Sequence, residues 1–264
     1  MEEQVLNKQE LSRYTRHIGL EQIGISGQEK LKKASVLVVG VGGLGSPVLQ
    51  YLAAAGVGKI GMADNDLIAE ENLPRQVIYS KKDIGMQKAI VARAKLADYN
   101  PYIDFQVHNI LFTDERVLKI IKDYDIVVDC TDNLPARYLL SDSCILTGRP
   151  LVHAALYKFQ GLVSVFNYND GPSYKCLFPY PPRSEKLLQA GRHGIMGVTV
   201  GVIGSMQAGE VIKIITGIGD VLSGKALVYN LLSNQSYVFN VPKNQENFEI
   251  EELIDYVEFC KPSV

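Results

Sequence analysis

The first candidate binding site in this sequence is a short turn that is rich in glycine. Gly40, Gly42, Gly43 and Gly45 come directly after the apolar run Val36–Val39, and an Ala/Leu-rich stretch follows them. A strand, a glycine-rich turn and a helix in this order bind phosphate groups, because glycine allows a tight turn and a close approach of the backbone. The free N–H groups and the dipole at the helix start favour negative charge. We therefore expect a nucleotide site at this turn.

Asp64 is the next residue that could contact a nucleotide. It lies about 20 residues after the turn, at the end of the apolar run Ile60–Ala63, where an acid can hydrogen-bond a ribose hydroxyl. NAD and ATP both carry a ribose, so the glycines and Asp64 leave the nucleotide open.

Polar side chains are dense between Asp66 and Ser80, where the periodic pattern stops. Asn72, Arg75 and Gln76 lie in this stretch. Loops with such content on an α/β scaffold often carry function.

Lys88 falls in the first turn of the helix predicted after this loop. A cation at that end opposes the helix dipole, and this small cost suggests an anionic partner. An exposed surface lysine is the alternative.

Asp129, Asp132 and Asn133 follow another apolar run, at the carboxyl end of a predicted strand. Open parallel sheets bind ligands at this edge. Asp132 also fits the N-cap of the helix predicted over 134–146, and the two roles can coexist. We expect Asp129 to be structural.

Arg13, Arg16 and His17 share one face of a helical stretch predicted over 8–33, by their i, i+3 and i+4 spacing. From the pattern alone, this is a solvated basic face.

Composition narrows the class of protein. The net charge of −2, from 27 basic and 29 acidic residues, gives no electrostatic case for nucleic acid. The acidic start Met1–Val5 is unlike a signal peptide. The apolar region Ile195–Ile215 is interrupted by Gln207, Glu210 and Lys213, so we predict a buried core helix and no membrane span. The four cysteines form no disulfide framework, which fits a reduced, cytoplasmic setting.

Alternating predicted elements favour an α/β fold: a Rossmann-like, mainly parallel sheet flanked by helices, with antiparallel C-terminal strands. The predicted strands are Ser35–Val39, 59–64, Ile103–His108, Asp125–Cys130, Pro150–Leu156 and Leu162–Tyr168, and a hairpin at 225–240 turns at Ser233 and Asn234. The predicted helices are 8–33, 45–56, Met86–Tyr99, Asp114–Asp123, 134–146, 194–216 and an acidic helix near 248–257. The irregular segment 169–193 is long enough to be a lid or binding loop.

These residues occur together in the order and spacing of one family. The motifs are Arg13–Arg16, Gly40–Gly45, Asp64, Asn72, Arg75, Gln76, Lys88, Asp129–Asn133, Cys176–Pro179 and Gly201–Glu210. The chain resembles the ThiF/MoeB/HesA adenylyltransferases, relatives of ubiquitin-activating enzymes, over about residues 8–240. The resemblance divides the chain into an N-terminal helical arm (1–34), an adenylation domain (35–241) and a C-terminal tail (242–264), where some similar proteins continue into a sulfurtransferase domain.

The resemblance implies an enzyme that uses ATP and Mg²⁺ to adenylate the C-terminal glycine of a ubiquitin-like sulfur-carrier protein ending in Gly-Gly. It implies that Asp64 binds the ribose, while Asn72, Arg75 and Lys88 contact the phosphates. The implied nucleotide-binding set is Gly40, Gly42, Gly43, Gly45, Asp64, Asn72, Arg75, Gln76, Lys88, Asp132 and Asn133.

The implied catalytic residues are Arg75, Lys88, Asp132 and Arg16. Asp132 matches the Mg²⁺-associated aspartate of the family. Arg16 matches a residue that reaches into the ATP site of a neighbouring subunit, which implies a homodimer and replaces the solvated-face interpretation for Arg16.

The sequence departs from the family in its cysteines. Many members bind structural zinc through two CxxC pairs, but here the first pair has Ser173 in place of a cysteine and the second pair is absent. We therefore expect no zinc, and Cys176 to be a buried thiol without a ligand. Residues 177–193 contain no cysteine, so we also expect no obligatory covalent link between enzyme and carrier.

Two other functions compete with the adenylyltransferase. A nicotinamide-dependent oxidoreductase explains the glycines and Asp64 but gives no role to Asn72, Arg75, Lys88 and Asp132. A catalytically silent scaffold that binds the carrier needs no such intact polar set. Thiamine and molybdenum-cofactor pathways are equally compatible with the sequence.

Overall fold

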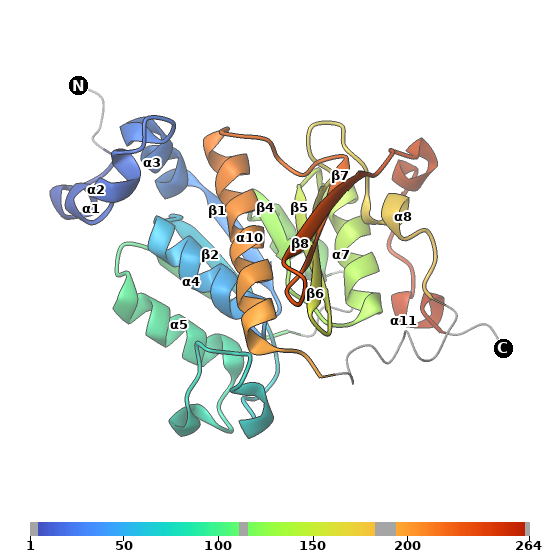
Figure 1. Ribbon diagram of the computed structural model, residues 1–264, viewed down its shortest axis with the longest axis horizontal. Helices are drawn as coiled ribbons and strands as arrows, with labels where there is room; N and C mark the ends of the chain where they lie inside the picture. Colours follow the sequence, from blue (N-terminus) through green and yellow to red (C-terminus); the bar gives the residue numbers. More distant parts are fainter. Residues whose placement is uncertain (1–4, 111–115, 183–193, 262–264) are drawn as a thin grey trace.

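An eight-stranded mixed sheet forms the centre of the protein, in the order β3-β2-β1-β4-β5-β6-β7-β8 (Figure 1). The computed structural model describes residues 5–110, 116–182 and 194–261. The strands are β1 (Ser35–Val39), β2 (Lys59–Ala63), β3 (Asp104–His108), β4 (Ile126–Asp129), β5 (Leu151–Tyr157), β6 (Gln160–Phe166), β7 (Lys225–Asn230) and β8 (Gln235–Asn240). The first five in spatial order pair in parallel, and β6, β7 and β8 pair antiparallel. The predicted fold class is confirmed.

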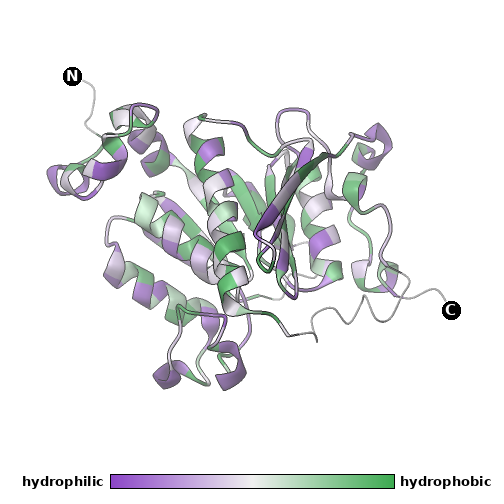
Figure 2. Cartoon of the chain, viewed as in Figure 1, coloured by the Kyte–Doolittle hydropathy of each residue, from purple (hydrophilic) through white to green (hydrophobic). Residues whose placement is uncertain are grey.

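Helices cover both faces of the sheet. One face packs against α4 (Gly45–Ala55), α5 (Lys88–Tyr99) and α10 (Gly197–Thr216), and the other against α6 (Arg116–Lys122) and α7 (Leu134–Thr147). In β1, Val36 and Val38 join the first core while Leu37 and Val39 join the second. Strands buried on both faces become continuous apolar runs, and Figure 2 shows the hydrophobic residues concentrated in the central strands and α10.

Helix α10 lies in the predicted 194–216 segment. It is the one described helix that is long and apolar enough to cross a membrane. Val200, Ile203 and Val211 instead pack in the core against strands of the sheet, so the prediction of a buried core helix is confirmed.

The order of the strands reverses at β1. From β1 the chain moves to β2 and β3 on one side, and then to β4 on the other side of β1. Ligands of open α/β sheets bind outside the carboxyl ends of the strands at such a switch point. The glycine turn follows β1, and Cys130–Asn133 follows β4, so both sequence motifs meet there.

Residues 8–33 are largely helical, as predicted, but they do not form one continuous helix. Three helices occur instead: α1 (Lys8–Arg13), α2 (Thr15–Ile18) and α3 (Gly24–Lys33). The chain leaves α1 at Tyr14, whose ring is buried against Gly56. Arg13 and Arg16 therefore lie on different helices. The Arg13 guanidinium donates to Tyr99 O at 2.6 Å and lies 5.0 Å from the Tyr99 ring, so Arg13 is not simply solvated.

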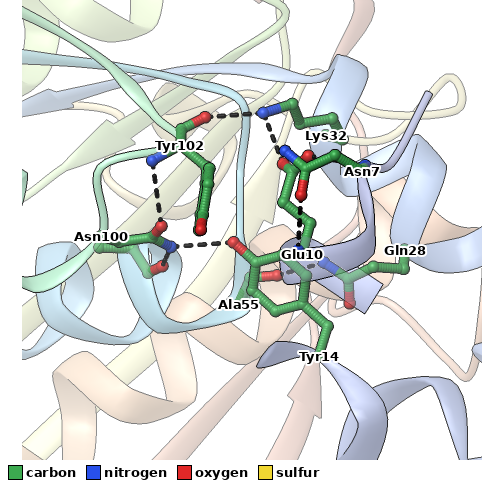
Figure 3. A network of polar contacts seen from close by, with 9 residues as sticks. Asn7, Glu10, Tyr14, Gln28, Lys32, Ala55, Asn100 and Tyr102 are labelled. Carbon is green, nitrogen blue, oxygen red and sulfur yellow. Dashed lines mark hydrogen bonds and ion pairs between the residues drawn. The ribbon is translucent and has the colours of Figure 1, made fainter. Parts of the chain in front are cut away.

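A buried polar network fixes this arm to the body (Figure 3). Asn100 Nδ2 lies 2.9 Å from Tyr14 Oη and 2.7 Å from Ala53 O, and Gln28 Nε2 donates to Ala55 O at 2.8 Å. An ion pair at 2.7 Å joins the buried Glu10 to the partly exposed Lys32.

Lys32 also donates to Tyr102 O at 2.7 Å, which joins helix α3 to the loop before β3. These bonds lie at the amino-terminal edge of the parallel strands, since Ala55 ends α4 and Tyr102 precedes β3. The arm is therefore fixed to the edge opposite the glycine turn.

The prediction of one acidic helix near 248–257 is wrong. The chain forms a short turn η4 (Gln245–Phe248) and a separate helix α11 (Tyr256–Phe259). Helix α11 begins late because the Asp255 side chain accepts the N–H groups of Val257 and Glu258 and caps it there. Tyr256 Oη then donates to Asp142 Oδ2 at 2.6 Å, which anchors α11 on α7.

Two further predictions concern segments that the structure describes only in part. The short helix α8 (Tyr174–Leu177) lies inside the segment 169–193 that was predicted to be irregular, and residues 183–193 lie outside the described residues. The predicted helix start at Asp114 also lies outside them, and α6 begins at Arg116.

The predicted hairpin is confirmed by β7 and β8, and Asn234 has a φ of 52° in its turn.

Replacing Asn100 tests the anchoring of the arm. Asn100→Ala removes the donors to Tyr14 and Ala53 and leaves buried acceptors unpaired, so we expect the free energy of unfolding in urea to fall by about 1–3 kcal/mol. Asp98→Ala, an exposed position near the end of α5, is the matched control and should change it by less than about 0.5 kcal/mol. Equal effects of the two variants would show that the network does not hold the arm.

Candidate active site

The glycine turn is shaped by contacts that exclude larger residues. A Cβ on Gly45 would lie 2.1 Å from Gly40 O, and one on Gly40 would lie 2.6 Å from Cys130 O. Gly40 also has a φ of 90°, a conformation that side chains disfavour. Helix α4 begins at Gly45, and no side chain caps its first N–H groups. Ser46 N–H donates to Gly42 O at 3.0 Å and Pro47 has no N–H, so an anion at the switch point would meet the N–H of Gly45 and the positive end of the helix dipole.

Asp64 ties the end of β2 to the glycine turn. Its Oδ2 accepts the N–H of Val41 at 2.7 Å, and its Oδ1 accepts the N–H of Asp66 at 2.8 Å. Burial raises the pKa of Asp64, although both backbone hydrogen bonds and Lys88 oppose the rise. Each carboxylate oxygen has a second lone pair that can accept a ribose hydroxyl. The geometry is therefore compatible with the predicted ribose contact.

Lys88 is buried, so the alternative of an exposed surface lysine is wrong. Its Nζ lies 2.7 Å from Asp66 Oδ2, and the side chain of Asp66 is 65% exposed. The Tyr79 hydroxyl lies 2.8 Å from Val41 O and 3.1 Å from Lys88 O, which connects the start of α5 to the glycine turn. The largely desolvated ammonium group thus pairs with Asp66, the residue whose N–H Asp64 accepts, and the carboxylate of Asp66 is exposed to water.

The polar loop between β2 and α5 folds back onto the glycines. The Asn72 carbonyl accepts the N–H groups of Arg75 at 3.0 Å and Gln76 at 2.9 Å. The Asn72 side-chain oxygen accepts Ala69 N–H at 3.1 Å, so only its amide nitrogen is left for a ligand.

Arg75 and Gln76 reach the turn from this loop. A Cβ on Gly42 would lie 3.3 Å from Gln76 Nε2, and one on Gly43 would lie 4.0 Å from Arg75 Cγ. Gln76 is buried and its Oε1 has no hydrogen-bond partner within the described residues. Arg75 Nη1 donates to Glu71 O at 2.8 Å.

The segment after β4 supplies Asp132 and Asn133. The N-cap of α7 is Asn133, whose Oδ1 accepts Ala136 N–H at 3.0 Å. The alternative of Asp132 as the N-cap is therefore wrong. Asp132 is exposed, and no hydrogen bond or ion pair of its carboxylate occurs within 5–110, 116–182 and 194–261. Among the described residues its carboxylate is therefore unpaired, which suits a ligand contact.

A buried cluster beneath this segment was not found from the sequence. Asp129 Oδ2 lies 2.7 Å from His153 Nδ1, and both side chains are fully buried. Gln207 Nε2 donates to Asp129 O at 2.7 Å, and Arg137 Nη2 donates to Thr131 O at 3.1 Å. The one available signal was a histidine inside the predicted apolar strand Pro150–Leu156.

Arg16 lies apart from the other predicted site residues. Helix α2 packs at the amino-terminal edge of the sheet, whereas the loop between β2 and α5 lies at the opposite end of the molecule (Figure 1). Arg16 is exposed. Within one chain, the structure does not bring Arg16 to the glycine turn.

The carboxylates near the glycine turn could hold Mg²⁺ only together with a bound nucleotide. Among the described residues no group of three or more His, Cys, Asp or Glu side chains gathers to hold a metal ion. Mg²⁺ in nucleotide sites needs only one or two carboxylates, because phosphate oxygens and water complete its ligands. Asp132, with its free carboxylate, fits that requirement.

Cys176 is not the buried thiol that the sequence suggested. Its sulfur is half-exposed and lies 3.3 Å from Asn244 N, 3.4 Å from Ser173 N and 3.4 Å from Asn247 Nδ2. Burial works to raise the pKa of Cys176, but these hydrogen bonds and that of the Ser173 hydroxyl outweigh it and lower the pKa. The sulfur therefore has enhanced thiolate character.

Comparison with known proteins connects the chain to one family. Residues 14–250 match the ThiF family. The "Adenylyltransferase and sulfurtransferase MOCS3" of Drosophila yakuba is 42% identical over 262 residues, which cover 97% of this chain and 58% of the relative. The "Sulfur carrier protein adenylyltransferase" of Thermus thermophilus is 43% identical over 264 residues, which cover 96% of this chain and 97% of the relative. The chain thus spans 58% of the length of the insect relative and nearly all of the bacterial one.

Solved structures share the fold at lower identity. E. coli MccB, crystallised with MccA-N7isoASN, has a TM-score of 0.78 at 24% identity, covering 89% of this chain and 72% of MccB. PaaA has a TM-score of 0.77 at 20% identity, covering 91% of this chain and 76% of PaaA.

The surroundings of the four cysteines predict which thiol reacts. Iodoacetamide at pH 7 should modify Cys176 at least about tenfold faster than the other three, because its lowered pKa raises the thiolate fraction while burial raises the pKa of Cys130, Cys144 and Cys260. Peptide mapping by mass spectrometry of the folded protein gives the rates. Ser173→Ala removes one hydrogen bond to the sulfur and should slow the reaction. Uniform labelling of all four cysteines would contradict this order.

Proposed function

The chain belongs to the ThiF family, and we propose that it is an ATP-dependent adenylyltransferase. Its substrate would be the C-terminal glycine carboxylate of a ubiquitin-like sulfur-carrier protein. The names of two relatives support this activity. The observation that carries it is the buried Lys88 beside the glycine turn, since a dinucleotide site needs no such cation there.

The reaction requires anions to be brought together. The carrier carboxylate attacks the α-phosphorus of ATP, a new oxygen–phosphorus bond forms, and the bond to the β-phosphate breaks to release pyrophosphate. The carboxylate is already ionised, so no general base is needed. The barrier lies in placing one negative charge against a triphosphate, and fixed cations lower it.

Arg75 and Lys88 are the cations that we assign to the phosphates. The planar guanidinium of Arg75 can contact two oxygens at once. Lys88 can exchange the exposed carboxylate of Asp66 for a phosphate at little cost, because Asp66 then returns to water. The amide of Asn72 and the buried Gln76 complete this side of the site, and Asp64 holds the ribose.

Asp132 is the residue that we assign to Mg²⁺. When bound, Mg²⁺ would neutralise phosphate charge as it moves to the leaving pyrophosphate. Asn133 caps α7 and so fixes the backbone next to Asp132.

We further propose that Arg16 acts in the active site of a second copy of the chain. Arg16 is exposed on α2, and α2 lies at the edge opposite the glycine turn, so Arg16 can act only in a neighbouring subunit. A groove of about 490 Å³ beside α2, lined by Leu20, Tyr51 and Ile212, offers an apolar surface for such a homodimer.

The activity would be cytoplasmic and would serve thiamine or molybdenum-cofactor biosynthesis. We place no zinc in the site and no obligatory covalent link between enzyme and carrier, the sulfur being delivered by another protein.

Isotope exchange between pyrophosphate and ATP tests the reaction directly. We expect exchange that depends on a Gly-Gly-ended carrier, and a loss of about 100-fold or more in Asp132→Ala and Arg75→Ala, as for removal of groups that stabilise transition-state charge. Lys81→Ala, an exposed lysine of the same loop, is the control and should retain wild-type exchange. Absence of exchange with every carrier would favour a silent scaffold, and reduction or oxidation of a nicotinamide would favour an oxidoreductase.

Mixing two inactive variants tests the dimer. Arg16→Ala subunits keep Asp132, and Asp132→Ala subunits keep Arg16, so each mixed dimer has one complete site. A randomly assorted equal mixture should recover about a quarter of wild-type exchange, since half of the dimers are mixed and each has one of its two sites intact. If no activity returns after the subunits exchange, Arg16 does not act across an interface.

A further inference from the structure

A buried pair of ionisable groups lies directly beneath the segment that carries Asp132. Asp129 ends β4, and His153 is its partner in the register of β4 with β5. Their side chains meet through Asp129 Oδ2 and His153 Nδ1 at 2.7 Å, and neither is exposed. Removing a carboxylate from water is costly unless it is paired and fully hydrogen-bonded, so this placement needs an explanation.

The second oxygen of Asp129 holds the segment above it. Asp129 Oδ1 accepts the backbone N–H of Thr131 at 2.9 Å and the Thr131 hydroxyl at 2.6 Å. Arg137 Nη2 donates to Thr131 O at 3.1 Å. Thr131 is thereby fixed at three atoms, and Asp132 is the next residue.

The protonation states follow from the surroundings. Burial lowers the pKa of His153 despite its contact with Asp129. Burial works to raise the pKa of Asp129, but the hydrogen bond from His153, the charge of Arg137 and the bond from Thr131 outweigh it and lower the pKa. The pair is thus an ionised Asp129 that accepts a hydrogen bond from a neutral His153, with the proton on Nδ1.

The other nitrogen of His153 does not contribute to this arrangement. Nε2 is buried without a hydrogen-bond partner in the described residues. The ring is packed near Tyr174 and Phe166, with centroids 5.0 and 5.9 Å away. The polar function of His153 in this structure is therefore limited to the bond with Asp129.

We propose that His153 is a positioning residue for adenylyl transfer, which through Asp129 and Thr131 fixes the direction of the Asp132 carboxylate. This inference rests on the proposed function. Without the His153 donor, one oxygen of Asp129 would be buried and unpaired, and the carboxylate would reorient toward other donors or water. Thr131 would then lose its anchor, and Asp132 would sample several directions at the phosphates.

Two substitutions of His153 separate its hydrogen bond from its bulk. Asn places an amide nitrogen at nearly the position of Nδ1, so His153→Asn keeps the donor to Asp129. His153→Leu removes the donor and keeps an apolar volume. Val152→Ala is the matched control, since Val152 is buried on the same strand but packs in the core on the opposite face of the sheet.

In ATP–pyrophosphate exchange, His153→Leu should lower kcat by about 10- to 100-fold and raise the Mg²⁺ concentration for half-maximal rate, as for loss of a group that orients a metal ligand. The KM for ATP should change by less than about threefold, because Asp64 and the glycine turn are untouched. His153→Asn should restore most of kcat and the wild-type Mg²⁺ requirement. If His153→Leu matches Val152→Ala in both quantities while the wild-type protein exchanges, the positioning role is wrong and the proposed function stands.

Binding of Mn²⁺ in the presence of a non-hydrolysable ATP analogue, followed by electron paramagnetic resonance, gives a readout that needs no carrier. The wild-type protein and His153→Asn should bind Mn²⁺ with similar affinity, and His153→Leu about tenfold or more weakly. This order supports the positioning role even if exchange fails with every carrier, and equal affinities overturn it. Should His153→Leu not fold, Thr131→Val removes the hydroxyl link without stranding a charge. A Mn²⁺ affinity unchanged in Thr131→Val would then overturn the proposal.

Discussion

The hydrogen bonds of Asp64 are the interaction on which the candidate site depends. Through Val41 and Asp66, one carboxylate holds the end of β2 against the glycine turn that follows β1. Lys88 is positioned by the same arrangement, since its partner Asp66 is the residue that Asp64 binds. Asp64 thus links the glycine turn to the buried cation, and the Tyr79 hydroxyl, which contacts Val41 O and Lys88 O, links them a second time.

The sheet gives the site its second side. Because the strand order reverses at β1, the segment after β4 lies beside the glycine turn, and Cys130 O packs against Gly40. The cations come from the β2 side and the free carboxylate of Asp132 from the β4 side. The opposite edge of the sheet carries the N-terminal arm, which a buried network holds in place with Arg16 exposed. One chain thus presents two edges that a symmetric dimer can bring together.

The sequence predicts the local features of this arrangement better than it predicts the long-range packing contacts. The glycine turn, the parallel core and the C-terminal hairpin were predictable, because each rests on neighbouring residues with a specific backbone requirement. The burial of Lys88 was not, since it depends on Asp66 and on a fold-back of the loop. The break of the arm at Tyr14 follows from contacts with Gly56 and Asn100, far away in the chain. His153 was missed because its partner, Asp129, lies on another strand.

The central claim is that the chain transfers AMP from ATP to a carrier carboxylate. A single turnover with ATP labelled at the α-phosphate, analysed by intact mass of the carrier and by separation of the nucleotide products, tests it most directly. We expect the label on the carrier's C-terminal glycine as an acyl-adenylate, together with one equivalent of pyrophosphate. Formation of ADP and inorganic phosphate, or a carrier of unchanged mass beside unconsumed ATP, would contradict the account.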